Sequence, residues 1–315
     1  MKCRICSNEK ENQRYQVREM MFGYRDVFSY FQCSACGCLQ ILDIPSDMSK
    51  YYPPHYYSYQ APSDKMEKDF LLQLRKGHSF FKKGFVGRFL YTKLLRKYWP
   101  HFDFLKITED ASILDVGCGS GALLYALCEL GMKNLLGIDP FNLKDIKYQN
   151  GLLIQKKPFC DVAGKWDIII FNHSFEHIPD PIETLETAFK LLKPAGCCVI
   201  RTPTVSSYAW KHYGVNWVQL DAPRHLFLHS IKSMALLADR VGLNFSETVY
   251  DSTSFQFWGS EQYIRNIPLR DQLPQSSNPK KSIFSKKEIS IFSKRAKELN
   301  KIKQGDQAVF YLTKS

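Results

Sequence analysis

Short runs of hydrophobic residues alternate with helix-like patterns through the middle of the chain. Between residues 111 and 203, the runs SILDVG, NLLGID, GLLIQ, WDIIIFN and CCVIRT each have the length and composition of one buried strand. The segment ALLYALCEL has helical periodicity, and Gly131 follows it as a helix-ending residue. Short apolar strands that alternate with helices are typical of a parallel sheet with helices on both faces. The pattern therefore predicts an α/β, doubly wound fold.

The clearest helix boundary in the sequence lies at residues 180–183. Asp180 is a natural N-cap, Pro181 suits the first helical position, and Glu183 stands three residues after the cap. We expect this helix to cover 181–193 and to end at the sequence KPAG. Beyond it, the pattern predicts a helix over 230–241, a strand over 243–250 and a last strand AVFYLTK.

The first 38 residues contain five cysteines, four of which form two C-x-x-C pairs. The 26 residues between the pairs alternate apolar and polar positions, as a hairpin does. Two such pairs can close a tetrahedral four-thiolate site, which has no open position for water and is therefore structural. The predicted zinc ligands are Cys3, Cys6, Cys33 and Cys36. Cys38 is the alternative to Cys36.

The composition is that of a globular protein, with 44% hydrophobic and 14% aromatic residues among 315. No apolar run approaches the roughly 18–20 residues that a membrane-spanning helix needs. The polar N-terminus MKCRICSNEKENQ lacks the apolar segment of a signal peptide. We therefore expect a cytoplasmic protein whose cysteines are thiols or metal ligands and not disulfides.

The formal net charge of +12 comes from two segments. Residues 75–106 carry nine Lys and Arg against one Asp, and residues 280–303 carry nine against two Glu. Both segments mix these bases with aromatic and aliphatic residues. The simple explanation is a pair of amphipathic helices with solvated basic faces. The functional alternative is a surface for membrane headgroups, a phosphorylated substrate or nucleic acid.

A glycine-rich turn, ILDVGCGSG, follows the first strand of the α/β region. A dinucleotide-binding turn would place its third glycine one residue later. Here Asp115 precedes the first glycine, and a carboxylate there would repel a pyrophosphate but suit an ammonium group. Asp139 ends the second strand about 20 residues after the turn, where an acid can bind both ribose hydroxyls. S-adenosylmethionine, an adenosine with an amino-acid tail, satisfies both carboxylates.

Residues 111–203 resemble the core of class I S-adenosylmethionine-dependent methyltransferases, close to the quinone-biosynthesis methylases. The resemblance rests on ILDVGCGSGALL, GIDP, WDIIIFNHSFEHIPDP and LLKPAGCCVIRTP. The segment LDAPRHLFLHS, residues 220–230, resembles methyltransferases associated with surface-polysaccharide clusters. The family implies a Rossmann-like sheet of seven strands and a set of cofactor-binding residues. These are Asp115, Gly117, Gly119 and Gly121 near the methionine, Asp139 at the ribose, and Asn172 and His173 beside the cofactor. The adenine contact stays open, with Gln155 near the usual place.

The domain organisation follows from these assignments. We predict a zinc-ribbon-like unit over 1–45 and a linker with a basic helical segment over 46–106. The methyltransferase domain covers 107–315, with inserts at about 204–229 and 252–305.

Residues 173–177, HSFEH, match the H-x-x-E-H pattern of inverted zinc peptidases. That chemistry needs both histidines on one helix, but a strand precedes the motif and the N-cap Asp180 follows it. We therefore interpret the motif as a loop beside the methyl donor. Transfer to a hydroxyl or carbon acid requires removal of a proton, for which histidine is suited near neutral pH. The candidate bases are His225 first and His177 second.

The predicted reaction is O-methylation, or C-methylation, of a small molecule, with a sugar or glycan precursor as acceptor. Many amino-nitrogen methylases carry N-P-P-Y at the end of the fourth strand. This chain has N-H-S-F there, which argues against methylation of an amino nitrogen. One alternative is an RNA methyltransferase that holds RNA through the zinc ribbon and the basic segments, although we disfavour a nucleic-acid partner. A further alternative is a non-catalytic zinc-ribbon adaptor, against which the intact acids and glycines argue. Basic-aromatic segments suggest peripheral contact with a membrane, and the sequence indicates no oligomeric state.

Overall fold

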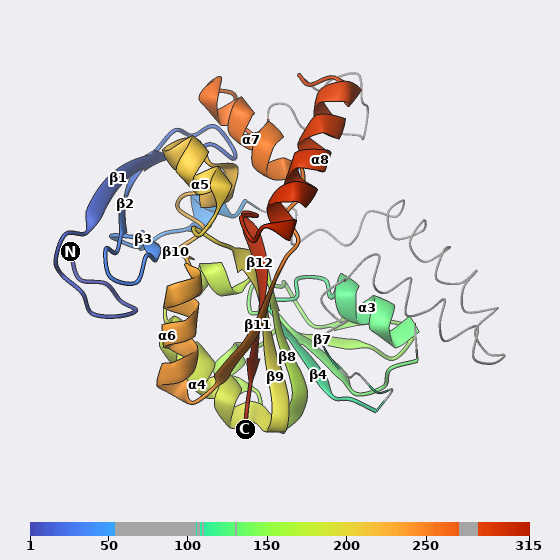
Figure 1. The fold of residues 1–315 in the computed structure, drawn as a ribbon. Helices are drawn as coiled ribbons and strands as arrows, with labels where there is room; N and C mark the ends of the chain where they lie inside the picture. Colours follow the sequence, from blue (N-terminus) through green and yellow to red (C-terminus); the bar gives the residue numbers. More distant parts are fainter. Residues whose placement is uncertain (54–104, 106–107, 109, 130, 271–282) are drawn as a thin grey trace. The chain divides into compact units, whose positions relative to one another are not determined.

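The computed structural model describes residues 1–53, 105, 108, 110–129, 131–270 and 283–315 (Figure 1). These residues group into two compact units that interleave along the chain. Unit 1 contains Met1–Pro53, His173–Glu186 and Ile200–Leu312, and unit 2 contains the described parts of Pro54–Asn172, Thr187–Val199 and Thr313–Ser315. The basic segment 75–106 and part of the 252–305 insert lie outside the described residues. The predicted domain boundaries stay predictions.

Unit 2 is built on a mostly parallel sheet with the strand order β9-β8-β4-β5-β7-β6. Its strands are β4 (Ile113–Val116), β5 (Leu135–Ile138), β6 (Ile146–Lys147), β7 (Leu153–Gln155), β8 (Trp166–Asn172) and the first part of β9 (Leu192–Pro203). All four residues of β4 are buried, as expected for a central strand of a covered sheet. The predicted strands are therefore confirmed, and β6 is an added antiparallel strand at the edge.

The described part of unit 2 contains one whole α-helix and the C-terminal part of another. Helix α3 (Ala122–Glu129) buries Leu123, Leu124, Ala126 and Leu127, and Gly131 follows it with a φ of +98°. Helix α4 (Pro181–Leu191) begins at the predicted proline but ends two residues before the predicted position. The KPAG segment is part of β9 because its backbone pairs with the chain's last residues. Ala195 N donates to Lys314 O at 3.1 Å, and Lys314 N donates to Gly196 O at 2.9 Å.

Unit 1 contains the strands β11 (Asn244–Tyr250) and β12 (Gln307–Thr313), in the order β11-β12-β9. The two strand orders share β9. Without the added edge strand β6, they contain the seven strands predicted for a Rossmann-like methyltransferase. The helices of unit 1 include α6 (Ile231–Val241), α7 (Phe255–Ile264) and α8 (Lys286–Lys301). Ser230 and Ser285 cap α6 and α8 through reciprocal capping boxes, which explains where these two helices begin.

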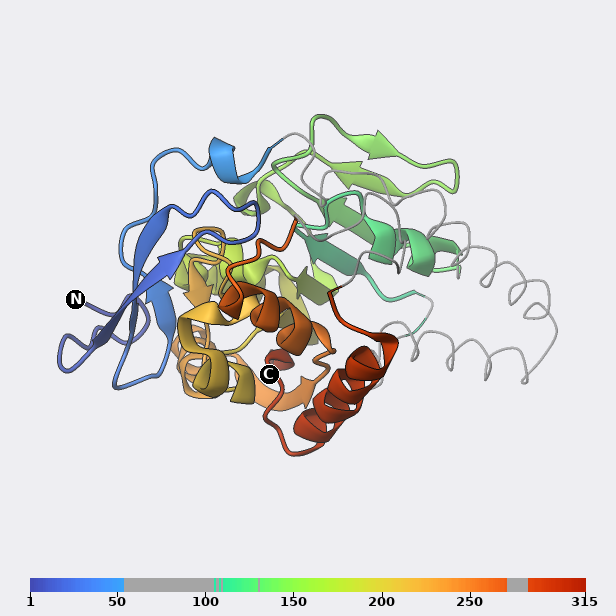
Figure 2. The same cartoon turned by 90° about the horizontal axis from the view of Figure 1, so that it is seen from above.

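A second sheet in unit 1 joins the N-terminal residues to the segment after the fifth predicted strand. Its order is β1-β2-β3-β10, and all its pairs are antiparallel (Figures 1 and 2). The strands are β1 (Gln13–Arg18), β2 (Val27–Gln32), β3 (Leu39–Ile41) and β10 (Phe227–Leu228). The hairpin between the cysteine pairs is therefore confirmed. The short strand β10 comes from the predicted 204–229 insert, which also forms α5 (Tyr208–Tyr213).

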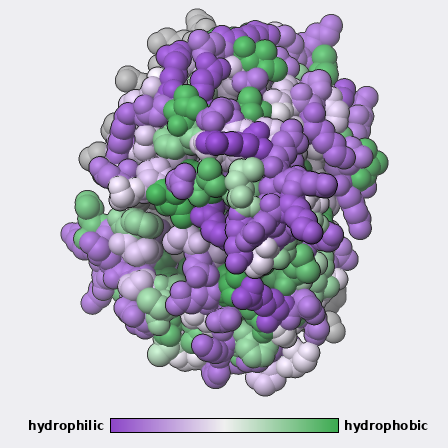
Figure 3. All heavy atoms as spheres, turned by 90° about the vertical axis from the view of Figure 1, so that its left-hand side faces the viewer, coloured by the Kyte–Doolittle hydropathy of each residue, from purple (hydrophilic) through white to green (hydrophobic). Residues whose placement is uncertain are grey.

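One face of the molecule shows few concentrated hydrophobic groups. Figure 3 shows one face on which hydrophilic side chains dominate and hydrophobic ones lie in small scattered groups. Within the part of the chain that the structure describes, no helix has the length and apolar character needed to cross a membrane.

Candidate functional site

The glycine turn after β4 has the backbone conformation that its sequence predicts. Gly117, Gly119 and Gly121 have φ values of +70°, +56° and +78°. Side chains with a Cβ rarely adopt these values, which is why the turn needs glycine. For Gly121 the packing is a second reason, because an added Cβ would lie 2.3 Å from Ile154 Cδ1.

Asp139 holds the glycine turn through its carboxylate. Gly119 N donates to Asp139 Oδ2 at 2.9 Å, and Phe141 N donates to Oδ1 at 2.9 Å. Each carboxylate oxygen keeps a second lone pair with which it can accept a ligand hydroxyl. The buried Asn142 adds a bond from Nδ2 to Gly119 O at 2.8 Å. Sequence reasoning missed Asn142, because a single asparagine in a loop has no distinguishing pattern.

Asp115 lies beneath the same turn with only 2% of its surface exposed. Its Oδ1 atom is buried and has no hydrogen-bond partner within the described residues. Burial, together with the charge of Asp139, raises the pKa of Asp115 to about 7. An unpaired buried carboxylate is costly, and an ammonium group of a ligand would remove that cost. The buried Asp115 carboxylate therefore fits the ammonium group at the amino-acid end of S-adenosylmethionine.

The end of β8 lies at the same sheet edge as the glycine turn, because Val116 pairs with Phe171 in the parallel register of β4 and β8. Asn172 follows as the last residue of β8 in unit 2. His173 belongs to unit 1 and has a φ of +54°, an uncommon value for a residue with a Cβ. Its Nδ1 lies 3.4 Å from Glu176 Oε1. Contact of Asn172 or His173 with a cofactor stays a prediction.

Unit 1 brings both predicted base histidines together around Glu176. We call Glu176, His177 and His225 the histidine–glutamate cluster. The ring centroids of His177 and His225 are 4.8 Å apart, and His225 Nε2 lies 3.9 Å from Glu176 Oε1. Glu176 is fully buried, and its Oε2 accepts a hydrogen bond from Thr202 Oγ1 at 3.0 Å. HSFEH forms a loop with a short 3-10 helix over Phe175–His177, so its side chains share no α-helical face, as predicted.

The two histidines of the cluster have the same tautomer. His177 Nδ1 lies 2.8 Å from Arg224 O, and His225 Nδ1 lies 2.7 Å from Gln219 O. A carbonyl oxygen only accepts, so each Nδ1 carries a hydrogen and each neutral ring keeps the lone pair of Nε2. Burial, with a smaller contribution from His225, lowers the pKa of His177. Nε2 is therefore the atom through which either ring can take a proton.

The charges around the cluster are arranged to suit a cationic group. Burial would raise the pKa of Glu176, but its contact with His173 and the charges of His225 and His177 lower it overall. His225 Nε2 also lies 3.8 Å from Asp221 Oδ2. Two carboxylate oxygens, at 3.9 and 3.8 Å, therefore lie beside the nitrogen that would accept a proton.

A buried ion network fixes the segment that carries His225. Arg224 is fully buried and contacts Glu19 Oε1 at 3.2 Å and Asp221 Oδ1 at 2.5 Å. Glu19 is also fully buried and accepts the backbone N–H groups of Phe22 and Tyr24. Sequence reasoning missed this network, because Arg224 and Glu19 are 205 residues apart and neither stands in a recognisable motif.

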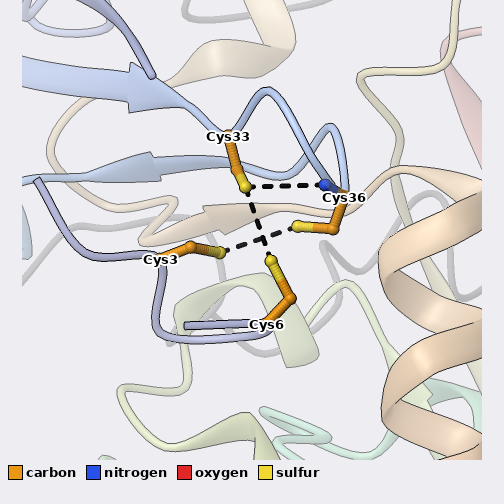
Figure 4. Close-up of side chains that lie close together, drawn as sticks. All are labelled: Cys3, Cys6, Cys33 and Cys36. Carbon is orange, nitrogen blue, oxygen red and sulfur yellow. Dashed lines mark hydrogen bonds between the residues drawn. The ribbon is translucent and has the colours of Figure 1, made fainter. Parts of the chain in front are cut away.

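The four predicted zinc ligands lie together, with their sulfur atoms directed toward one another (Figure 4). The Cys3–Cys36 and Cys6–Cys33 sulfur pairs are 3.6 Å and 3.5 Å apart. Zn–S bonds of about 2.3 Å in a tetrahedron place sulfurs roughly 3.8 Å apart, so the cluster fits Zn²⁺. The contact between Cys3 and Cys36 lowers the pKa of Cys3 and, together with burial, raises the pKa of Cys36, so this sulfur pair shares one proton. A bound Zn²⁺ would displace that proton, because the thiolate is the ligating form.

Cys38 lies outside this cluster. Its Sγ is 3.9 Å from His229 Nδ1, and the thiol is buried. Backbone N–H groups of Ile5 and Cys36 donate to the sulfurs of Cys3 and Cys33, as they do in metal-binding knuckles. The geometry therefore favours Cys36 over Cys38 as the fourth ligand.

Comparison with known proteins identifies one family. A family profile described as "Methyltransferase domain" matches residues 88–248, just over half of the chain. The ubiquinone biosynthesis O-methyltransferase of Psychrobacter arcticus is 28% identical over 187 residues, covering 52% of this chain and 72% of that protein. The protein of the same name from Caulobacter vibrioides is 32% identical over 124 residues, covering 35% and 48%.

Solved structures are similar to a lower degree. An S-adenosylmethionine-dependent methyltransferase from Archaeoglobus fulgidus superimposes with a TM-score of 0.41 and 17% identity, covering 80% of this chain and 98% of that chain. The cyclopropane synthase MmaA2 from Mycobacterium tuberculosis gives a TM-score of 0.45 and 14% identity, covering 70% and 84%.

Proposed function

The chain belongs to the methyltransferase-domain family and is an S-adenosylmethionine-dependent enzyme, and from this premise we propose that it methylates a hydroxyl group of a small molecule. The observation that carries this proposal is the histidine–glutamate cluster of unit 1. It offers imidazole nitrogens with fixed tautomers beside buried carboxylates, as removal of a hydroxyl proton requires. Relatives named O-methyltransferases support the choice of oxygen as the methylated atom.

In this proposal, the residues that bind the methyl donor belong to unit 2 with the exception of His173. S-adenosylmethionine supplies a methyl group on a sulfonium, which needs no further activation. Asp115 pairs with the ammonium group, and Asp139 accepts the ribose hydroxyls while it holds the glycine turn. Gly117 and Gly119 let the ligand approach the backbone. Asn172 and His173 are proposed to border the cofactor.

Residues of unit 1 act on the acceptor in this proposal. His225 Nε2 accepts the hydroxyl proton, and Glu176 and Asp221 stabilise the resulting imidazolium. The donated Nδ1 hydrogen fixes the ring orientation. His177 is the second candidate for the base, because its ring has the same tautomer.

The four-cysteine cluster is proposed to hold one structural Zn²⁺. Support comes from the sulfur distances and from the absence of any other ligand type in the cluster. Four thiolates leave no open position on the metal, so the site takes no part in the chemistry.

The acceptor class is tested by product detection. Purified protein is incubated with S-adenosylmethionine carrying a deuterated methyl group and with one acceptor at a time. The first acceptors to test are nucleotide sugars, as the sequence predicts, and a ubiquinone precursor, to which the names of the relatives point. We expect a labelled methyl ether on one small molecule. Labelling of RNA alone would contradict the proposal and favour the RNA methyltransferase alternative.

The raised pKa of Asp115 makes cofactor binding pH-dependent. The carboxylate must be ionised to pair with an ammonium group, and its pKa without ligand is about 7. Below that value, binding must expel a proton, so affinity falls by up to about tenfold per pH unit while the ammonium stays charged. We expect calorimetry to show this loss between about pH 7 and 5. Asp115→Asn should bind S-adenosylmethionine weakly at every pH. If its affinity depends on pH as steeply as that of the wild type, the assignment is refuted.

Peripheral membrane contact is proposed for the basic face of α8. Lys294, Lys297 and Lys301 are exposed and spaced to share one side of the helix. Each lysine near an anionic bilayer contributes about 1 kcal/mol, so replacing all three with alanine should weaken binding to phosphatidylglycerol vesicles roughly a hundredfold. Sedimentation with vesicles measures this. The triple alanine variant of Lys133, Lys144 and Lys147 removes equal charge, and an equal loss there would contradict a local α8 surface.

A further inference from the structure

A second set of metal-compatible side chains lies in unit 1, apart from the cysteines. One oxygen of Glu176 and one nitrogen each of His177 and His225 lie within 4.8 Å of one another. Two imidazoles and one carboxylate are a common ligand set for Zn²⁺ and related cations, and they leave coordination positions open. Metal–ligand bonds of about 2.1 Å in a tetrahedron place ligand atoms roughly 3.4 Å apart. The 3.9 Å between Glu176 Oε1 and His225 Nε2 needs only a small side-chain movement.

The carboxylate of Glu176 has an unused oxygen. Glu176 is fully buried, and Thr202 donates only to Oε2. Oε1 makes no hydrogen bond, although His173 Nδ1 lies 3.4 Å away and His225 Nε2 lies 3.9 Å away. Native proteins rarely leave a buried anionic oxygen without a donor, because its lost hydration is costly. A cation bound at Oε1 would compensate for that loss.

The histidines are already oriented as metal ligands are. A metal-bound histidine normally donates its other ring hydrogen to a carbonyl or carboxylate, which fixes the ring and its tautomer. His177 donates from Nδ1 to Arg224 O, and His225 donates from Nδ1 to Gln219 O. The Nε2 lone pair of His225, 3.9 Å from Glu176 Oε1, is therefore available to a cation, and His177 offers one ring nitrogen to the same group.

We infer that the histidine–glutamate cluster binds one divalent transition-metal cation and that this cation inhibits methyl transfer. The inhibition rests on the proposed function, because the cation takes the Nε2 lone pair of His225 that would otherwise accept the acceptor's proton. The binding itself does not depend on the identity of the acceptor. Imidazole ligands select Zn²⁺, Co²⁺, Ni²⁺ or Cu²⁺ over Mg²⁺, which prefers an all-oxygen octahedral shell.

The test uses the full chain with zinc already bound at the cysteines. Co²⁺ is added, and its visible absorption reports a nitrogen–oxygen site, which lacks the thiolate charge-transfer bands of cobalt at cysteines. We expect one Co²⁺ per chain and inhibition of methyl transfer with the same midpoint, reversed by a chelator. Mg²⁺ should neither bind at this site nor inhibit. Co²⁺ binding without inhibition, or with faster turnover, would overturn the inhibitory role.

Variants locate the site. Glu176→Gln keeps the side-chain shape, and it should weaken Co²⁺ binding at least about tenfold, as should His177→Ala. His212→Ala is the control, because His212 is exposed on α5 and lies outside the cluster. Cofactor titration and circular dichroism check that each variant is folded.

Unchanged Co²⁺ affinity in folded Glu176→Gln and His177→Ala, or no Co²⁺ binding by the wild type, would overturn the metal site. Absence of Co²⁺ binding would overturn the metal site but leave the proposed role of His225 in methyl transfer untouched. If no acceptor is methylated, the Co²⁺ titrations of the wild type and the variants still test the metal site.

Discussion

Replacing His225 with alanine is expected to lower the rate of methyl transfer by about 10²- to 10⁴-fold, the usual contribution of a general base. The affinity for S-adenosylmethionine should stay at the wild-type value, because its proposed charged ligands, Asp115 and Asp139, belong to unit 2 and His225 is not among the proposed cofactor contacts. The physical reason is the loss of Nε2, which lies beside Glu176 and Asp221 and would take the acceptor's proton. Single-turnover measurement with saturating donor and acceptor isolates this step from product release.

Two further variants make the His225 result specific. His177→Ala should cost less than His225→Ala, and the reverse order would assign the base to His177. His212→Ala carries the same chemical change at an exposed position and should retain the wild-type rate. A loss below about tenfold in a folded His225→Ala variant would show that neither proton acceptance nor its positioning limits the reaction.

If the four-cysteine cluster holds the proposed zinc, its removal is expected to abolish methyl transfer while S-adenosylmethionine still binds. Structural zinc sites contribute about 10–16 kcal/mol of apparent binding free energy to small domains, enough to unfold a short sheet when lost. The sheet β1-β2-β3-β10 contacts this cluster, because Gln40 of β3 donates from Nε2 to Cys3 Sγ at 3.2 Å, and it also contacts the His225 segment. Tyr30 donates to His225 O at 2.9 Å, and Ile41 N donates to Leu226 O at 3.0 Å.

Cysteine variants test the zinc prediction without a chelator. Cys33→Ser should lose the metal, measured as zinc per chain, together with methyl transfer. Cys160→Ser is the matched control, because Cys160 is exposed in unit 2, and it should keep both. Full zinc content in Cys33→Ser would contradict the ligand assignment. Full activity in zinc-free protein would contradict the supporting role of the sheet.

The elements of the α/β core could be predicted because their signals are local. The strand β4 is apolar at three of its four residues, and the glycines after it permit the positive φ angles that the turn adopts. The N-cap and proline at 180–181 fixed the start of α4 in the same way. The predicted end of α4 was wrong, because β9 begins at Leu192 and its KPAG segment pairs with residues about 120 positions away. Local sequence contains no signal for such a pairing.

The histidine–glutamate cluster was only partly predictable for the same reason. The roles of His177 and His225 as candidate bases followed from their places after strands, but no local pattern indicates that Glu176 lies beside His225, 49 residues further along the chain. Strand β10 has two residues, too few for any periodic pattern, yet it joins the N-terminal sheet to the His225 segment. The metal-like motif HSFEH was rightly separated from the peptidases. Its Glu176 and His177 nevertheless meet a third metal-compatible side chain, His225, from 48 residues further along the chain.

The central claim, that the acids of unit 2 hold S-adenosylmethionine, is tested most directly by calorimetric titration of that ligand into wild-type protein and Asp139→Ala. If Asp139 binds the ribose as proposed, the variant would lose two charge-assisted hydrogen bonds, each contributing about 1.5–3 kcal/mol. It also loses the acceptor for Gly119 N and Phe141 N. Asp161→Ala, at an exposed position of the same unit, is the control. We predict one binding site in the wild type and the control, and an affinity more than about a hundredfold weaker in Asp139→Ala. Equal affinity in all three proteins would contradict the account.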